Sequence, residues 1–516
     1  MMLVTLLALA AVLLAISGAR KLRRSRSQAH PGRPPLPPGP APLPFLGNVL
    51  GVNKDAPHLT YTAWSKTYGD IVYTRMLGQD IILLNSERVA VELLEKRSQK
   101  YSDRPVFAAA DLFDYEWPSS SARYGPRFRL HRRLLHQVFH AKAALDYRER
   151  QLQRAYELLT RLLDDPARYA AHFTTFSASV VMGVTYGYDM KGGDTFVTSM
   201  QRASDIFLGI ATPEIFALCI AFPFVKALPA WFPGMGWKSK AAECRRLVSD
   251  GLNTPYAWVK RRVEQGDTTP SMVADAIIRH RLEDDSNNPE LVQAIKESAG
   301  TLYAASVETT HATLLVFVYL MMNHPEVQCR AQAEIDRVVA HQRLPDFEDR
   351  ASLPYIDAVL RETMRSHPVT PIGVPHATTE DDVYEGCYIP QGATIIPNIC
   401  RAMSHDEEKY PNPEVFMPER FLREDGTLNE DKVPYMFGFG RRLCPGRHVG
   451  DASLWSAMVC ILTLFRIEKT EGSDNVKWST GLARHPLPFP CRFIPRDEEM
   501  DCQKLASLIY ASRIAL

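Results

Sequence analysis

The chain has 516 residues, of which 46% are hydrophobic and 23% are charged, and its formal net charge is +1 at pH 7. This composition excludes a disordered chain and predicts a globular protein with a substantial core. A net charge so close to zero gives no reason to expect nucleic acid as a partner. The nine cysteines form no C-x-x-C pair, which is typical of a reduced, cytosol-facing protein rather than of a disulfide framework.

The N-terminus begins with an uncharged stretch, residues 1–19. As a helix it would measure about 28 Å, close to the thickness of a bilayer core. Five basic residues follow between positions 20 and 26, and this order places the rest of the chain on the cytoplasmic side. A cleaved signal peptide would carry its charge before the apolar stretch. The sequence therefore favours a retained transmembrane anchor at 1–19.

A basic and proline-rich segment, residues 20–44, comes next. Eight prolines lie between Pro31 and Pro44, and such a stretch adopts an extended, semi-rigid conformation. We interpret it as a stiff hinge between the anchor and the body. No repeat or second linker follows, so residues 45–516 are predicted to form one domain.

Within this domain, short β-type runs occur at 71–75 and 81–84, and helical periodicity dominates from about residue 145 to residue 360. Strand signals return at 384–396. The predicted fold class is mainly α with small β-sheets. The longest predicted helix spans 291–323, about 50 Å. Its middle is polar, with Glu308, Thr309 and Thr310 in sequence. From the residues alone, these threonines could equally well bond back to helix carbonyls as a local polar patch.

A second helix, predicted at 353–367, carries Glu362 and Arg365. The spacing Glu-x-x-Arg is common on solvated helices and is weak evidence by itself. Further on, the run from Phe437 to Gly446 reads FGFGRRLCPG. It presents Cys444 in a glycine-rich loop, two residues after Arg442. Such a cysteine suits the thiolate ligand of a haem iron. A buried structural cysteine and a zinc ligand are the alternatives, and zinc would require further Cys or His at short spacing.

The spacing F-x-x-G-x-R-x-C-x-G, matched by Phe437, Gly440, Arg442, Cys444 and Gly446, resembles the haem-loop signature of the cytochrome P-450 superfamily. The likeness extends from about residue 30 to the C-terminus. It implies the cytochrome P-450 fold behind an N-terminal transmembrane helix, with Cys444 as the metal ligand. It also implies a haem cofactor held by these loop residues.

The resemblance assigns roles to further residues. The segment Ala305 to Thr310 is similar to the family motif A/G-G-x-D/E-T-T, with Ser306 in place of a glycine. It implies that Thr309 and Glu308 are catalytic and deliver protons during O₂ cleavage. Arg132, Arg442 and His376 are implied to hold the haem propionates. Phe128 stands where the family pattern W-x-x-x-R has tryptophan, so an indole N–H contact is lost or replaced by His131.

The same resemblance implies that Glu362, Arg365 and Arg420 form a buried structural triad. Residues expected to line the substrate pocket are 106–117, 207–215, Tyr303, Ala304, Ile372, Val374 and 481–482.

The loop from Pro371 to Asp382 resembles fungal microsomal enzymes of the O-methylsterigmatocystin oxidoreductase type. This implies a monooxygenase that hydroxylates a hydrophobic small molecule in secondary metabolism, a terpenoid or polyketide. The chain has no dinucleotide fingerprint, so O₂ chemistry would need electrons from a separate NADPH–cytochrome reductase. The expected location is the endoplasmic reticulum membrane, with a single-pass anchor and the catalytic domain facing the cytosol. An oxygen-independent haem isomerase or dehydratase, and a haem-binding sensor without turnover, are the alternatives.

Overall fold

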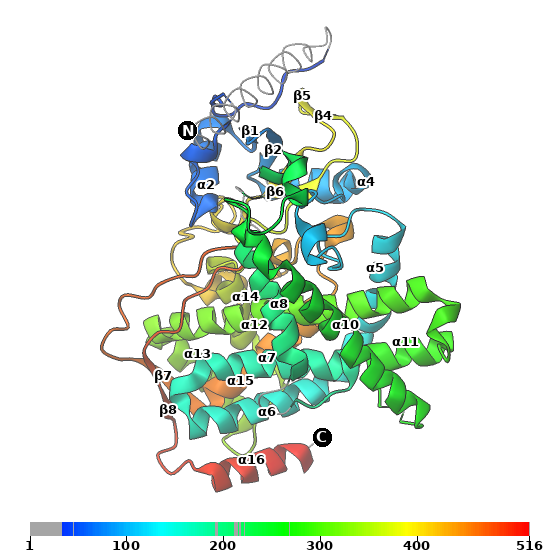
Figure 1. The fold of residues 1–516 in the computed structure, drawn as a ribbon. Coiled ribbons are helices and arrows are strands. Elements are labelled where there is room, and N and C mark those ends of the chain that lie inside the picture. Colours follow the sequence, from blue (N-terminus) through cyan, green and yellow to red (C-terminus); the bar gives the residue numbers. More distant parts are fainter. Residues whose placement is uncertain are drawn as a thin grey trace.

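The computed structural model describes residues 33–44, 46–190, 195–210, 215, 218–220, 222–267 and 269–514. The predicted anchor at 1–19 lies outside the described residues. Among the described residues helices predominate and the sheets are small, which confirms the predicted fold class. Figure 1 shows the strands β1, β2 and β6 gathered near the N-terminal end, with the longer helices packed below them.

The helices have the following bounds: α2 (Pro57–Tyr68), α3 (Glu87–Ala90), α4 (Ser98–Tyr101), α5 (Pro126–Phe139), α6 (Arg148–Asp164), α7 (Tyr169–Tyr186), α8 (Thr195–Ile210), α10 (Ala241–Glu264), α11 (Met272–His280), α12 (Pro289–Asn323), α13 (Pro325–Val339), α14 (Pro354–Ser366), α15 (Arg447–Leu464) and α16 (Cys502–Ile514).

The main sheet has four strands in the order β1-β2-β6-β3, where β1 is Ile71–Met76, β2 is Gln79–Leu84, β6 is Thr394–Pro397 and β3 is His376–Ala377. β2 pairs antiparallel with β1 and parallel with β6, with Ile82 opposite Ile395. Because β2 lies inside the sheet, its run Ile81 to Leu84 is buried throughout and reads as continuously apolar. Two further pairs join β4 (Asp382–Tyr384) to β5 (Cys387–Ile389) and β7 (Phe465–Lys469) to β8 (Cys491–Pro495).

The described half of the predicted hinge, residues 33–44, lies against this sheet. The backbone carbonyls of Pro38 and Pro35 accept hydrogen bonds from the N–H groups of Tyr73 (2.9 Å) and Tyr388 (2.7 Å). A Cβ atom at Gly39 would lie 1.8 Å from the Tyr73 carbonyl oxygen, so only glycine permits this approach. This half of the proline-rich segment is therefore fixed to the folded body.

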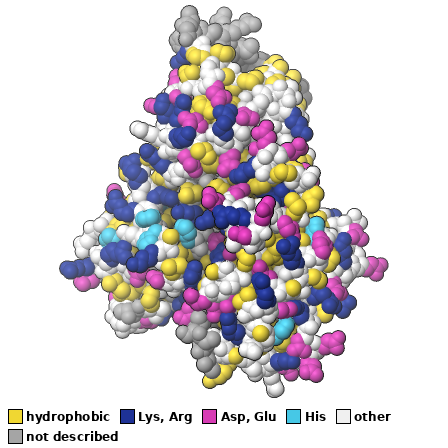
Figure 2. All heavy atoms as spheres, turned by 180° about the vertical axis from the view of Figure 1, so that it is seen from behind, with side chains coloured by type: hydrophobic (Ala, Val, Ile, Leu, Met, Phe, Trp, Pro, Cys, Tyr) yellow, Lys and Arg dark blue, Asp and Glu magenta, His cyan; other side chains and the backbone are white. Residues whose placement is uncertain are grey.

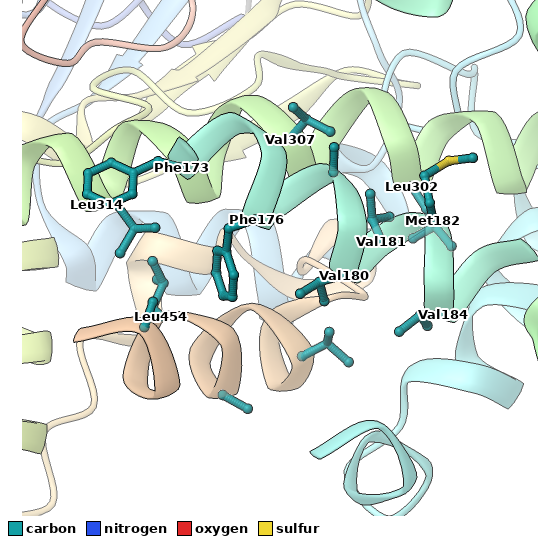
Figure 3. Close-up of a cluster of buried hydrophobic side chains, with 14 of the residues drawn as sticks. Phe173, Phe176, Val180, Val181, Met182, Val184, Leu302, Val307, Leu314 and Leu454 are labelled. Carbon is teal, nitrogen blue, oxygen red and sulfur yellow. The ribbon is translucent and has the colours of Figure 1, made fainter. Parts of the chain in front are cut away.

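The helix α12 is the axis of the helical part, and it begins two residues before its predicted start. Asn288 caps it by accepting a hydrogen bond from Leu291 N–H, and Pro289 occupies the first turn. Among the described residues, α12 alone is long and apolar enough to cross a membrane, but most of its apolar stretch is buried within the protein. Figure 3 shows α7 side chains, including Phe173 and Phe176, packed between α12 and α15.

Candidate functional site

Cys444 lies in the loop that leads into α15. Its backbone N–H donates to the Phe437 carbonyl (2.8 Å), and α15 begins three residues later, so the positive end of the helix dipole lies nearby. Burial raises the pKa of the Cys444 thiol, while the Gly446 N–H, Arg132 and Arg447 act in the opposite direction. A cysteine in such surroundings is prepared to become a thiolate when a cation coordinates it.

Gly440 gives this loop its shape. Its φ is +53°, and a Cβ atom there would lie 2.1 Å from the Leu94 carbonyl oxygen. The loop therefore approaches the backbone of residues 91–96 more closely than any other residue would allow. Gly440 does not itself line the cavity described next, so its contribution to a cofactor site is steric.

A cavity of about 330 Å³ opens above Cys444. Seven of the predicted site residues line it: Thr309, Cys444, Arg442, Arg132, His376, Phe437 and Gly446. One wall comes from α12, a second from α5, and a third from the cysteine loop with the start of α15. The structure thus brings together predicted site residues that are up to 314 positions apart in the sequence, namely Arg132 and Gly446.

Three guanidinium groups converge on one side of this cavity. Arg442 is buried and donates to the carbonyls of Ser102 (2.8 Å) and Ala122 (2.7 Å). Arg132 donates to the Leu443 carbonyl (2.8 Å). Burial lowers the pKa of both groups, that of Arg442 to about 10. Each guanidinium donates only to backbone carbonyls among the described residues, so no carboxylate neutralises it directly.

The third cation, Arg104, was not among the predicted site residues. It is buried, lines the cavity and donates to the carbonyls of Ser120 (2.7 Å) and Val374 (2.6 Å). Burial, followed by the charge of Arg442, lowers its pKa well below the ordinary value. In the sequence it follows Asp103 directly, which suggests a local solvated pair. The structure shows instead that Asp103 binds Arg123.

His376 and Phe128 complete this side. The His376 ring is buried, and its Nδ1 lies 2.8 Å from the Tyr101 carbonyl, so Nδ1 carries the proton. Burial, with Arg104 and Arg442, lowers the pKa of His376 well below 6.5, which keeps the ring neutral. The Phe128 ring lies under Arg442, 3.6 Å from the guanidinium carbon to the ring centroid. His131 does not replace an indole here, because its Nε2 lies 3.0 Å from Glu297 and outside the cavity lining.

These residues fit a haem. The buried Arg104 and Arg442, the partly buried Arg132 and the His376 imidazole line one side of the cavity without a carboxylate partner of their own. Buried charges are costly unless they are paired. A flat ligand with two carboxylates would supply that charge. Cys444, which lines the cavity, would be its protein ligand. The described residues contain no cluster of three or more His, Cys, Asp or Glu that could hold a metal ion. A structural zinc site is therefore excluded for the described part of the chain.

The opposite wall of the cavity is the polar middle of α12. Thr309 lines it, and its hydroxyl donates to the Ala305 carbonyl (2.9 Å), which is the back-bonding expected of a threonine within a helix. Ser306 also lines the cavity, and its carbonyl accepts a hydrogen bond from Ser177 on α7 (2.9 Å). The serine that replaces the family glycine therefore stands at the cavity wall.

Glu308, the second predicted catalytic residue, does not line this cavity. Its carboxyl group has no hydrogen bond or ion pair among the described residues. Burial raises its pKa, His485 acts to lower it, and Asp205 acts to raise it. Glu308 therefore stands beside Thr309 as an acid without a fixed partner.

The predicted triad is present below the cavity. Arg365 donates to both oxygens of Glu362 (2.6 and 2.8 Å), and Arg420 Nε donates to Glu362 (3.1 Å). Glu362 and Arg365 are fully buried. The remaining donors of Arg365 bind the carbonyls of Ser404 and Pro413. Every charge in this cluster is therefore both paired and hydrogen-bonded, as buried ions require.

Of the residues predicted to line a substrate pocket, Val374 lines this cavity. Part of the predicted range 207–215 lies outside the described residues. The cavity is also lined by Ser119, Thr301, Leu302, Val369 and Thr370. The other predicted substrate contacts stay predictions.

Comparison with known proteins agrees with this site. The family described as cytochrome P-450 matches residues 37–493. Cytochrome P-450 monooxygenase 98 of Postia placenta is 36% identical over 484 residues, which cover 91% of this chain and 92% of that protein. Cytochrome P-450 monooxygenase claR of Ampulloclitocybe clavipes is 36% identical over 472 residues, covering 89% of this chain and 86% of that protein.

Proposed function

The chain belongs to the cytochrome P-450 family of haem monooxygenases, and from this premise we propose that it hydroxylates a hydrophobic small molecule. The proposed activity uses O₂ and electrons from NADPH–cytochrome reductase at a membrane. The observation that carries this proposal is the cavity above Cys444, where unpaired cations lie on one side and the hydroxyl groups of α12 on another.

Cys444 is proposed to hold the cofactor, and Arg104, Arg132, Arg442 and His376 to bind its two carboxylates. When bound, the haem supplies the redox chemistry that inserts one oxygen atom of O₂ into a C–H bond. Cys444 and the cations would together orient the cofactor, since they line different parts of the cavity wall. The apolar side chains of Val180, Val181, Val184 and Leu302, which also line the cavity, would exclude water from it.

Thr309 is proposed to hold a proton at its Oγ1 atom on the oxygen-binding side of the cavity. The hydrogen bond from Thr309 to the Ala305 carbonyl must then break before the hydroxyl can donate elsewhere. Glu308 is proposed to restore that proton through water. Its pKa is raised towards neutral pH, so the carboxyl group holds a proton more readily than an ordinary glutamate. Apolar residues around the distal cavity favour a hydrophobic substrate. The loop resemblance supports fungal secondary metabolism as the setting.

Attachment to the endoplasmic reticulum membrane is proposed from the apolar stretch at 1–19. The segment after it supports this proposal, since Leu43 and Leu50 are exposed by 53% and 70% and Leu36, Leu46 and Leu59 are also exposed. Figure 2 shows hydrophobic side chains gathered toward the narrow end of the body. Exposed apolar residues near an anchor are typical of a membrane-facing surface.

Docking of the reductase is proposed at the cysteine loop, where Arg441 is exposed and Arg447 is partly exposed. Charge attraction of this kind weakens as salt is added. The rate at which the reductase reduces the protein should therefore fall as the ionic strength is raised. A rate independent of salt would overturn this docking site.

The deciding experiment replaces Cys444 with serine in the full chain. We expect the wild type to show the carbon monoxide difference band of a thiolate haem and to oxidise NADPH with reductase. Cys444→Ser should lose both. Cys460→Ser, on the buried face of α15, is the matched control and should retain both. Retention of the thiolate band in Cys444→Ser would refute the proposed ligand.

A further inference from the structure

Two histidines outside the cavity lining, His311 and His485, contact each other and have no role in the proposed function. His311 is one helical turn from Glu308 at i+3, so their side chains share a face of α12. His485 belongs to the loop between β7 and β8, and its ring centroid lies 5.7 Å from that of His311 in an edge-to-face arrangement. Neither ring lines the cavity.

The hydrogen bonds fix which nitrogen of each ring is basic. The Nδ1 atom of His485 lies 2.8 Å from the Pro486 carbonyl. A carbonyl only accepts, so Nδ1–H donates and Nε2 is the free basic nitrogen. The Nδ1 atom of His311 lies 3.1 Å from the Thr174 hydroxyl, which donates its own proton to the Ala170 carbonyl (3.2 Å). His311 Nδ1 is therefore also the donor. Among the described residues, His485 Nε2 has no hydrogen-bond partner.

The two histidine rings differ in how far they are buried. Burial, followed by the charge of His485, lowers the pKa of His311 to about 4. His311 is thus neutral near pH 7 and holds the His485 ring in place by packing. His485 is partly exposed to solvent and can exchange protons with water. Among the charged groups acting on Glu308, His485 acts most strongly.

We propose that His485 is the proton donor that recharges Glu308, with His311 and Thr174 as positioning residues. This inference rests on the proposed role of Glu308. In the step, the Nε2–H bond of the His485 imidazolium breaks and an O–H bond forms on the Glu308 carboxylate, directly or through one water. Solvent then returns a proton to Nε2, while Nδ1–H stays on the Pro486 carbonyl. No electron is transferred in this step.

Other groups packed around this pair do not replace His485. Asp205 on α8 is an acid that acts against ionisation of Glu308, and the Tyr115 hydroxyl bonds Ser204 (2.9 Å). Burial raises the pKa of Tyr115 to about 12, which makes it a poor proton carrier. Arg484 directs its guanidinium group to His58 (2.7 Å), away from this pair.

The first test has no activity readout. The haem-loaded full chain, labelled with ¹³C at histidine Cε1, is observed by NMR at one pH in its diamagnetic ferrous carbon monoxide form. Glu308→Gln removes the carboxylate that is proposed to take the proton of His485, so the Cε1 resonance of His485 should move. Glu326→Gln on α13 is the control and should leave that resonance in place. A His485 resonance that Glu308→Gln does not move would overturn the proposal.

The second test measures hydrogen peroxide released per NADPH with reductase. Slower proton delivery diverts reduced oxygen to peroxide, so His485→Gln and Glu308→Gln should each raise this ratio at least about twofold. His311→Ala removes the ring that packs against His485 and should raise the ratio as well. His280→Gln, at the exposed end of α11, is the control and should stay near the wild type. A rise in Glu308→Gln without one in His485→Gln would overturn the relay and leave the role of Glu308 standing. No rise in either variant would overturn both.

Discussion

The protein has two clusters of arginines, the triad with Glu362 and the group around the cavity, whose charges are satisfied in different ways. In the triad, Arg365 and Arg420 share the carboxylate of Glu362. Around the cavity, Arg104 and Arg442 donate only to backbone carbonyls. A buried ion without a counter-charge costs several kcal/mol. The charges of the triad are therefore compensated within the protein, whereas the cavity cluster keeps a positive charge that a dianionic ligand would compensate.

Glu362→Ala should give the largest effect. It leaves two buried guanidinium groups without their carboxylate, and the free energy of unfolding should fall by about 3–5 kcal/mol. Urea denaturation followed by circular dichroism measures this loss, and the reduced carbon monoxide spectrum should show little bound haem. The matched control is Glu243→Ala, another Glu-x-x-Arg pair, whose carboxylate meets an exposed Arg202. It should cost about 1 kcal/mol or less. Equal losses in the two variants would contradict the distinction.

Near the triad, protonation of His367 at low pH should destabilise the folded protein. His367 follows α14 and stacks on Trp478 at 4.9 Å. Burial, with Arg401, Arg484 and Arg365, lowers its pKa to about 4 from 6.5. The unfolded chain therefore binds one more proton than the folded chain between these values. Stability is complete above pH 6.5 and is lost as the pH falls towards 4, by roughly 3 kcal/mol from this group.

His367→Gln should remove that part of the pH dependence. Unfolding free energies measured at pH 7 and pH 4 should differ less in the variant than in the wild type. His280→Gln, at the exposed end of α11, is the control and should keep the wild-type difference. If His367→Gln left the difference between the unfolding free energies at pH 7 and pH 4 unchanged, protonation of His367 would not cause the loss of stability at low pH.

The contrast between the two clusters was only half predictable from the sequence. The triad and the residues Arg132, Arg442 and His376 follow a motif spacing, so a family resemblance locates them. Arg104 has no such signal, because its burial depends on the distant carbonyl of Val374. The helix α12 was predicted nearly to the residue because capping and periodicity are local. The pairing of β7 with β8 was missed, since it joins segments 22 or more residues apart.

Arg104→Met should separate folding from cofactor binding. The substitution keeps most of the side-chain volume and removes a buried charge, so the haem-free protein should melt at the wild-type temperature or above it. The haem-loaded protein should lose about 1–3 kcal/mol, because one propionate contact is gone. Melting temperatures of both forms test this. A lower melting temperature of the haem-free variant would show that Arg104 is structural, like Arg365.

The smallest effect should come from Phe128, whose ring lies 3.6 Å from the Arg442 guanidinium carbon. Phe128→Leu keeps an apolar side chain but removes the face on which Arg442 stacks, a contact worth about 1 kcal/mol. Arg442 would then be held less firmly, and haem should dissociate about fivefold faster, as measured by transfer to apomyoglobin. Phe128→Trp keeps a ring face and adds an indole N–H that can reach a propionate, so dissociation should be no faster than in the wild type. Faster loss from Phe128→Trp than from Phe128→Leu would show that the cavity has no room for the larger ring. The Arg442 stacking would then not be what limits haem retention.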